Sequence, residues 1–139
     1  MSDMRVFFTH RGRDIADFAD GCSDAELDQL PLGLVLLDAN AKILRYNKTE
    51  GALTGRDPKA VIGRNFFLDL AACGVGPLFW GRFKQGILKS DYDEVFPYVF
   101  WHEMPETAML VRMTLARKAK QRAMWVMVRR IMPTLPSRG

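Results

Sequence analysis

The sequence contains few of the residues from which metal centres and disulfide scaffolds are built. Two of its 139 residues are cysteines and two are histidines. Cys22 and Cys73 could form one disulfide bond at most, which is weak grounds for a disulfide scaffold, and no CxxC motif or Cys/His cluster is present. His10 and His102 lie far apart in the chain. The sequence therefore predicts no metal site, and each cysteine could equally be a buried thiol without a role.

Long apolar runs are also missing. The longest aliphatic run, Leu34 to Leu37, is far shorter than the roughly 20 apolar residues that a membrane-spanning helix needs. The N-terminus holds charged residues such as Asp3, Arg11 and Arg13 in place of the apolar stretch of a secretory signal. We therefore expect a cytoplasmic protein that does not bind a membrane. The length allows one compact domain and is too short for two ordinary ones.

Acidic residues are absent from the last part of the chain. Residues 111–139 contain 8 Lys and Arg and no acid, whereas residues 1–110 contain 12 Lys and Arg and 16 acidic residues. Such a basic segment can bind nucleic acid or an acidic partner, but a charge run is more often the solvated face of an element. We favour the solvated outer face of a sheet, with no nucleic-acid partner, for Arg112, Arg117, Lys118, Lys120, Arg122, Arg129 and Arg130.

The residues that are present follow the pattern of an α+β domain. Short stretches rich in aliphatic and aromatic residues predict five strands. A tight turn separates the first two, and the last three follow one another, so we expect a five-stranded antiparallel sheet. The predicted strands are 32–37, 42–46, 94–102, 107–118 and 122–131.

Helices are predicted between the second and third strands. Residues 47–63 should form two short helices, the first with Asn47 as its cap and Glu50 at its third position, the second beginning at an Asp-Pro pair. Apolar residues recur at helical spacing from 79 to 88. Between these helical stretches, Cys73 begins a Gly- and Pro-containing loop.

The chain divides into three parts. Residues 1–28 should form a helical N-terminal cap that lies on the main domain, residues 29–131. The tail, 132–139, has too few apolar residues and too much proline to belong to the core.

Four stretches form a specific pattern: YNKTEG at 46–51, TGRDP at 54–58, VIGRNFF at 61–67 and WVMVRR at 125–130. They resemble the photoactive yellow protein family, and the resemblance covers about residues 25–131. It implies a PAS fold with helices on one face of the sheet. It also implies a blue-light receptor, not an enzyme, that carries p-coumaric acid (4-hydroxycinnamic acid) as a thioester on Cys73 and signals to an unknown downstream protein.

The resemblance implies a role for each residue of a chromophore site. Tyr46 and a protonated Glu50 would hold the phenolate oxygen, Thr54 would hold the Tyr46 hydroxyl, and Arg56 would cover the pocket. A buried carboxyl without a cationic partner has a raised pKa, so it can stay neutral and donate a hydrogen bond. Read from the residues alone, Glu50 is better explained by a helix capping box, and it is the resemblance that favours the chromophore role. The apolar wall would come from Val35, Leu70, Phe100 and Met104.

The chain departs from the family pattern near the thioester. His102 stands where the family usually has a tyrosine, Ala72 stands where proline is common, and Gly74 follows the cysteine. An imidazole near the chromophore would alter the lifetime and pH dependence of the photoproduct, although a solvent-facing histidine at a strand end fits the sequence equally well. Met104 matches a methionine that speeds dark recovery in the family.

The resemblance also implies how a signal leaves the site. Proton transfer from Glu50 would leave a buried carboxylate without a cation, and we expect the N-terminal cap, held by few contacts, to detach. Two other functions remain open: a PAS module without a chromophore that binds a partner, and a thiol redox sensor that uses Cys73.

Overall fold

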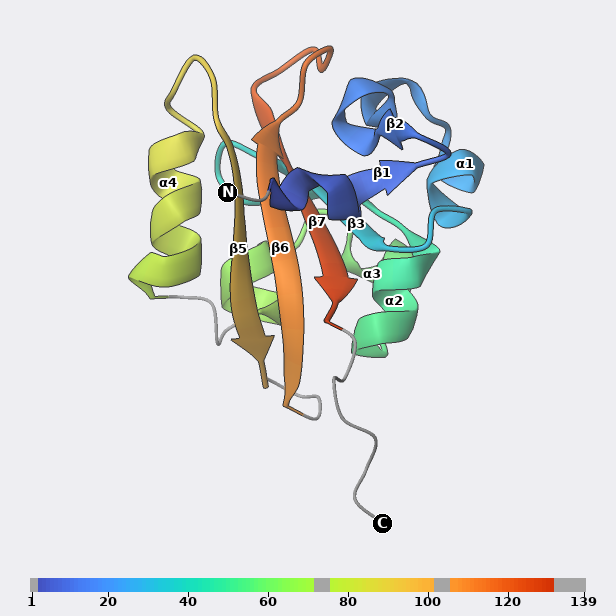
Figure 1. The fold of residues 1–139 in the computed structure, drawn as a ribbon. Coiled ribbons are helices and arrows are strands. Elements are labelled where there is room, and N and C mark those ends of the chain that lie inside the picture. Colours follow the sequence, from blue (N-terminus) through green and yellow to red (C-terminus); the bar gives the residue numbers. More distant parts are fainter. Residues whose placement is uncertain (1–2, 72–75, 102–105, 132–139) are drawn as a thin grey trace.

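The computed structural model describes residues 3–71, 76–101 and 106–131, and its centre is one five-stranded antiparallel sheet (Figure 1). The strand order is β4-β3-β7-β6-β5, so the first strand of the sheet pairs with the last. The predicted α+β fold with five antiparallel strands is therefore confirmed. The strands are β3 (Gly33–Asp38), β4 (Ile43–Tyr46), β5 (Asp93–Phe100), β6 (Thr107–Leu115) and β7 (Ala123–Arg130).

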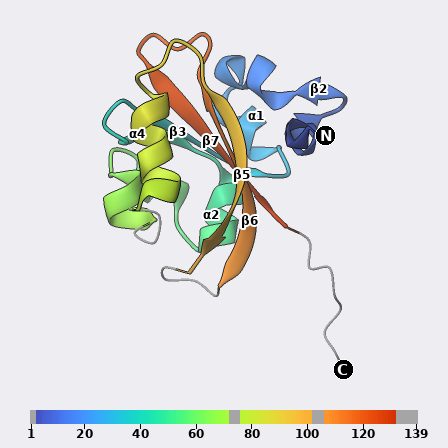
Figure 2. The ribbon, with the colours of Figure 1, turned by 60° about the vertical axis from the view of Figure 1, so that its left-hand side comes forward.

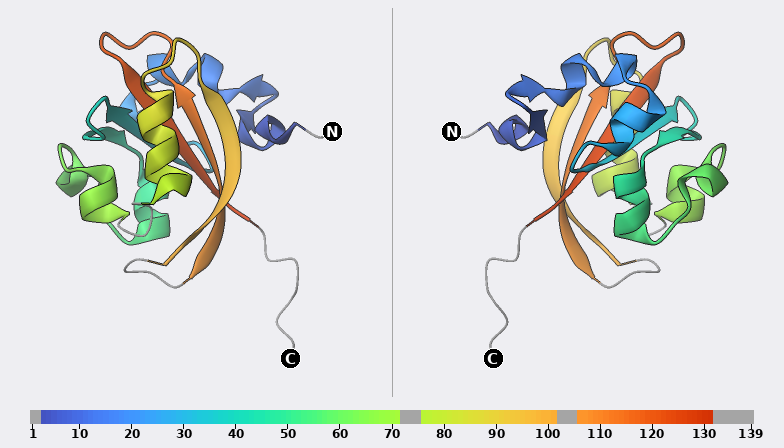
Figure 3. Two further views of the ribbon diagram at one scale, coloured as in Figure 1. Left: turned by 90° about the vertical axis from the view of Figure 1, so that its left-hand side faces the viewer. Right: turned by 90° about the vertical axis from the view of Figure 1, so that its right-hand side faces the viewer.

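Side chains alternate across the sheet and divide the core in two, as the period of a strand requires. The inner face carries Val35, Val111 and Val126, and the outer face carries Leu34 and Trp125 on the same strands. All five are buried, so both faces of the sheet are covered. Figure 3 shows what covers them: the middle helices lie on one side and the N-terminal elements on the other.

The inner face is covered by short helices with well-defined ends. Gly55 ends the first of them in the left-handed region, at φ 74°, which glycine adopts without strain. The helix predicted at 79–88 is divided into a π-helical turn and an α-helix. The elements are α2 (Lys48–Thr54), α3 (Pro58–Val61), the π-helical turns η4 (Phe66–Leu70) and η6 (Pro77–Gly81), and α4 (Arg82–Gly86), as Figure 2 shows for α2 and α4.

The N-terminal elements cover the outer face and are less helical than predicted. They include a two-stranded hairpin and three 3₁₀ turns, and α1 is their single α-helix among the described residues. Phe8, Ile15 and Leu27 bury their side chains against Leu34 and Trp125 of the sheet. We call residues 3–28 the cap. Its elements are η1 (Met4–Phe8), β1 (Thr9–His10), β2 (Arg13–Asp14), η2 (Ile15–Asp17), η3 (Ala19–Gly21) and α1 (Asp24–Asp28).

Two expectations about this face are wrong. Arg112 was expected on a solvated face, but its side chain is fully buried because the cap covers it. The guanidinium lies between Asp14 of the cap, with Nη1 2.6 Å from Oδ1, and Asp93 of β5, with Nη2 2.8 Å from Oδ2. The cap was also expected to be held by few contacts, yet this ion-pair group and an apolar core hold it. Arg129 and Arg130 are exposed, as predicted.

No helix within the described ranges combines the length and the apolar character that crossing a membrane requires.

Candidate functional site

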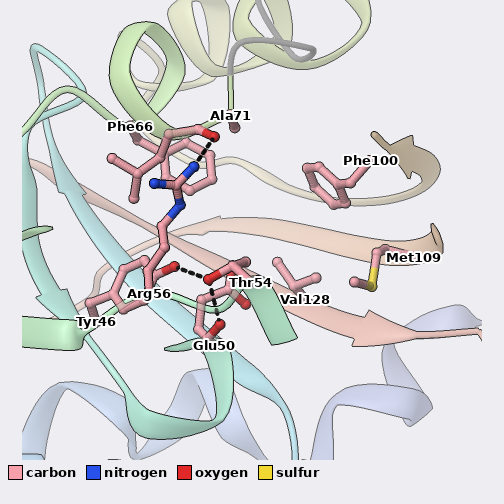
Figure 4. A pocket seen from close by; sticks show the side chains of 10 residues that line it. Tyr46, Glu50, Thr54, Arg56, Phe66, Ala71, Phe100, Met109 and Val128 are labelled. Atoms are coloured by element: carbon pink, nitrogen blue, oxygen red, sulfur yellow. Dashed lines mark hydrogen bonds between the residues drawn. The ribbon is translucent and has the colours of Figure 1, made fainter. Parts of the chain in front are cut away.

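A small cavity lies between the inner face of the sheet and the α2–η4 region (Figure 4). Its polar groups come from β4, α2 and the turn after α2, and its apolar wall comes from η4 and three strands. Its described lining residues are Tyr46, Glu50, Thr54, Arg56, Phe66, Leu70, Ala71, Phe100, Met109 and Val128.

Asn47 fixes the first turn of α2, from which Glu50 projects. Its Oδ1 accepts hydrogen bonds from the backbone N–H groups of Leu34 and Glu50, both at 3.0 Å. Its Nδ2 donates to the carbonyl oxygens of Leu27, at 2.8 Å, and Leu32, at 3.1 Å. The buried amide therefore joins the cap, β3 and α2 at one point.

Glu50 does not complete a capping box. In a capping box its carboxylate would accept from the backbone N–H of Asn47, but that N–H donates to the carbonyl of Leu34 at 3.1 Å. The Glu50 side chain is 4% exposed and lines the cavity instead. Its Oε1 is buried and has no hydrogen-bond partner within the described chain. Burial raises the pKa of the Glu50 carboxyl to about 7.

The absence of a side chain at Gly33 makes room for this carboxyl. A Cβ at position 33 would lie 1.9 Å from Glu50 Oε1, which is closer than two unbonded atoms can approach. The first residue of β3 therefore sets where the Glu50 carboxyl can lie. The sequence analysis did not identify this position.

Tyr46 and Thr54 form a hydrogen-bonded pair beside Glu50. Their hydroxyl oxygens are 2.8 Å apart, and Thr54 Oγ1 donates to the carbonyl oxygen of Glu50 at 2.9 Å. A threonine hydroxyl has one proton, so Tyr46 is the donor to Thr54. Burial, followed by the nearby Glu50 carboxyl, raises the pKa of Tyr46. The phenol therefore keeps its proton at neutral pH.

Arg56 lies over the cavity between α2 and η4. Its Nη2 donates to the carbonyl oxygen of Leu70 at 3.3 Å, and Figure 4 shows the side chain extending from the Tyr46 side of the site toward Phe66 and Ala71. The free space that remains is about 30 Å³, enough for one or two water molecules. A planar aromatic acid therefore enters only if side chains such as Arg56 move aside.

The structure brings together six of the residues singled out from the sequence: Tyr46, Glu50, Thr54, Arg56, Leu70 and Phe100 line one cavity. Val35 is buried in the inner core, opposite Tyr46 in the sheet, but is not among the lining residues.

The predictions for Cys73, His102 and Met104, and for Ala72 and Gly74, fall outside the described residues.

The sequence analysis missed part of the apolar wall, namely Phe66, Ala71, Met109 and Val128. Met109 and Val128 occupy inward-facing positions of β6 and β7, so the two-residue period of each strand was the signal that could have found them. Phe66 begins the irregular η4 and Ala71 follows it, and no such period exists there.

The donor set suits an oxygen-bearing anion. Within residues 3–71, 76–101 and 106–131, no three His, Cys, Asp or Glu side chains are grouped so as to hold a metal ion. In contrast, a buried neutral carboxyl and a tyrosine hydroxyl can both donate toward one oxygen atom. The residues therefore fit the phenolate end of an aromatic ligand, whose ring would contact the apolar wall.

Comparison with known proteins gives a consistent result. A family model described as PAS fold matches residues 24–131. The photoactive yellow protein of Halochromatium salexigens is 42% identical over 118 residues, which is 85% of this chain and 93% of that protein. The photoactive yellow protein of Rhodothalassium salexigens is 40% identical over 118 residues, 85% of this chain and 93% of the relative.

A solved structure agrees with these sequence matches. The photoactive yellow protein domain of the sensor histidine kinase Ppr from Rhodospirillum centenum superimposes with a TM-score of 0.76 at 39% identity, covering 83% of this chain and 99% of that domain. The PAS domain of an HTR-like protein from Haloarcula marismortui, at 18% identity and a TM-score of 0.59, shares the fold alone.

Proposed function

Because the chain belongs to the photoactive yellow protein family and has its PAS fold, we propose that it is a blue-light photoreceptor carrying a p-coumaroyl thioester on Cys73. The family is one of photoreceptors and the PAS fold is a sensory module, so the chain is a sensory protein and not an enzyme. The observation that carries the finer proposal is Glu50 Oε1, which is buried in the cavity without a partner in the described chain. A buried oxygen of this kind is costly unless a ligand completes its hydrogen bonding.

When bound, the p-coumaroyl group supplies blue-light absorption and a double bond that light can isomerise. In the dark, neutral Glu50 donates a hydrogen bond to the phenolate oxygen. Tyr46 turns its proton from Thr54 to the same oxygen, and Thr54 in turn donates to Tyr46. Arg56 covers the site and limits the access of water.

Transfer of the Glu50 proton to the phenolate oxygen would supply the driving force for signalling. A carboxylate at this position loses its hydration, and no cation among the described residues lowers its pKa in compensation. The cost of the buried carboxylate acts on α2, which is hydrogen-bonded to the end of the cap and to the segment after it. Lys48 N donates to Asp28 Oδ1 at 2.8 Å, and Thr49 Oγ1 donates to the Leu30 carbonyl at 2.8 Å. Movement of α2 therefore loosens the cap, and the signal passes to a partner protein.

The test is to load the protein with activated p-coumaric acid and record its absorption before and after a blue flash. We expect a visible band that bleaches and recovers in the dark. Cys73→Ala should abolish the band, whereas Cys22→Ala should retain it. Cys22 is a suitable control because its thiol is half-buried in the cap, donates to the Phe18 carbonyl at 3.5 Å and has a pKa raised by burial. Without a band in the loaded wild type, a partner-binding PAS domain becomes the better account.

Glu50→Gln tests the proton donor in the same assay. An amide donates less strongly than a carboxylic acid, so the phenolate keeps more charge and the dark band should move to longer wavelength. Glu26→Gln, on the exposed side of the cap, should leave the band in place. An unshifted band in Glu50→Gln would remove Glu50 from the site.

Two further roles rest on the resemblance. We assign thermal recovery to Met104, so Met104→Ala should slow the return of the dark band. We assign the pH dependence of recovery to His102, which His102→Tyr should flatten between pH 5 and 8 if an imidazole titrates near the chromophore.

A further inference from the structure

The Asp20 carboxylate of the cap occupies a set of hydrogen-bond donors at the turn between β6 and β7. Its Oδ2 accepts from the backbone N–H groups of Arg117, at 2.7 Å, and Lys118, at 2.6 Å. Its Oδ1 accepts from Trp125 Nε1 at 2.6 Å. Three N–H groups from the sheet domain therefore converge on one carboxylate from the cap. Figure 1 shows the cap beside this turn. We call these donors the turn site.

The surroundings of the turn site are strongly cationic. Residues 117–122 contain four Lys and Arg and no acidic residue. The Arg117 guanidinium pairs with Asp17 of the cap, and Arg122 Nη1 donates to the Lys89 carbonyl at 2.6 Å. Lys118 and Lys120 are exposed. The two acids that face this turn from the cap, Asp17 and Asp20, both leave it if the cap moves away.

The turn site is already shown to bind a carboxylate, because Asp20 is one. Adjacent backbone N–H groups form a concave anion-binding site, and a neighbouring guanidinium adds a charge-assisted donor. A hollow next to the site is lined in part by Leu115, Ala116 and Ala119. These apolar side chains can contact the aliphatic part of an incoming acidic side chain.

We propose that the turn site is a docking site for an acidic segment of a partner protein, and that Asp17 and Asp20 of the cap block it until the cap detaches. The site suits a protein carboxylate better than a nucleic acid because its three convergent donors match one carboxylate, not an extended row of phosphates. Only the step in which light detaches the cap rests on the proposed photoreceptor function. The docking site itself does not depend on it.

Because Asp20 competes with a partner for the turn site, variants of the cap acids should change the affinity of that site. A partner binds only the fraction of molecules in which the site is open, so its apparent affinity falls by that fraction. Asp20→Ala removes the competitor and should strengthen binding by about tenfold or more. Asp17→Ala frees the Arg117 guanidinium without uncovering the Trp125 indole, so it should strengthen binding by a smaller factor.

The experiment measures binding of a fluorescein-labelled peptide of eight glutamates by fluorescence anisotropy, in the dark and without chromophore. The matched control is Asp24→Ala, which removes a cap carboxylate that pairs with Arg45 at 2.9 Å on another part of the sheet. The net charge changes equally in the two variants. Peptide binding to Asp20→Ala should also shift the NMR signal of the Trp125 indole N–H, which locates the peptide. If Asp20→Ala does not fold, Asp17→Ala carries the same test.

Three results would overturn the proposal. The first is equal peptide affinity in wild type, Asp20→Ala and Asp17→Ala, and the second is an equal gain in Asp24→Ala. The third is equally tight binding of a DNA duplex by Asp20→Ala. The last would identify a general cationic surface. A separate arm illuminates the chromophore-loaded wild type, whose affinity should rise toward that of Asp20→Ala. Tight binding by Asp20→Ala without any effect of light would leave the docking site standing and contradict the light-driven release of the cap.

Discussion

The two faces of the sheet treat buried charge in opposite ways. On the inner face, Glu50 is a buried acid whose pKa is raised to about 7 by burial. On the outer face, Arg112 is a buried cation held between Asp14 and Asp93. Burial lowers the pKa of Arg112, but the hydrogen bonds to Asp93 and Asp14 outweigh it and raise the pKa above its usual value.

We call the inner face, which holds Glu50, the responsive face and the outer face, which holds Arg112, the locked face. The protonation of Glu50 can change near neutral pH, because burial raises its pKa to about 7. Arg112 stays charged at all accessible pH values, and its two partners stabilise the docked cap. The inner face can therefore start a structural change, whereas the outer face sets the resistance that the change must overcome.

Removing the locked cation should have the largest effect. Arg112→Met fills much of the same volume but leaves Asp14 and Asp93 close together without a cation, so we expect a loss of about 3 kcal/mol in the free energy of unfolding. Urea denaturation of the chromophore-free protein at pH 7 measures it. Arg129→Met is the control, because Arg129 is exposed on the neighbouring strand. Equal losses in the two variants would mean that the buried ion pairs of Arg112 stabilise the fold no more than the exposed Arg129 does.

Glu50 should make the free energy of unfolding depend on pH between about 4.5 and 7. Arg112 keeps its charge throughout this range. Folded Glu50 keeps its proton to about pH 7, whereas the unfolded chain releases it near 4.5. The folded state therefore binds more protons, and stability is full below pH 4.5, falls as the pH rises to about 7, and then levels off. The total fall is about 3 kcal/mol.

Glu50→Gln should flatten this part of the profile, measured by urea denaturation from pH 4.5 to 8. Glu106→Gln, at an exposed carboxylate, should keep the wild-type slope. A persisting slope in Glu50→Gln would assign the pH dependence to another group. The Asp14 contribution has the opposite sign: its pKa is lowered, with burial opposed by the Arg112 hydrogen bond, so its stabilisation is present above pH 3.8 and lost below.

The smallest expected effect concerns the space beside Glu50. Gly33→Ala places a methyl group where Glu50 Oε1 lies, and overpacking of this kind typically costs about 2 kcal/mol. The loss should shrink in a Glu50→Ala background, where the carboxyl is gone. Gly21→Ala is the control, since a Cβ there has nothing within 4 Å. Thermal unfolding of the four variants gives the coupling, and additive losses would show that Gly33 and Glu50 do not compete for space.

The sequence predicted most of the sheet, and it singled out six of the ten described residues that line the cavity. Strand positions followed from local apolar patterns, but β6 ends at Leu115 and not at residue 118. The reason is distant in the chain: Asp20 takes the backbone N–H groups of Arg117 and Lys118. The burial of Arg112 has a similar origin, because its partner Asp14 lies 98 residues away. The charge run led to the correct expectation that Arg112 lies on the outer face, but it could not reveal what covers that face.

The first turn of α2 shows which features local sequence predicts and which depend on tertiary contacts. The Asn47 cap was predicted correctly from its local pattern, since Asn47 Oδ1 accepts from Glu50 N. The carboxyl of Glu50 turns to the cavity because the Leu34 carbonyl takes the N–H that a capping box would use. No pattern within α2 contains that information. The two π-helical turns were missed for a related reason, as their irregular backbones give no periodic signal.

Asn47 also determines which parts of the molecule can open independently. The Leu34 amide proton is held by Asn47 Oδ1, and the other end of the same side chain holds the carbonyls of Leu27 and Leu32. That proton is released to solvent only when the junction of cap, β3 and α2 separates. The exchange rate of this single amide with deuterated water therefore measures how often the junction opens.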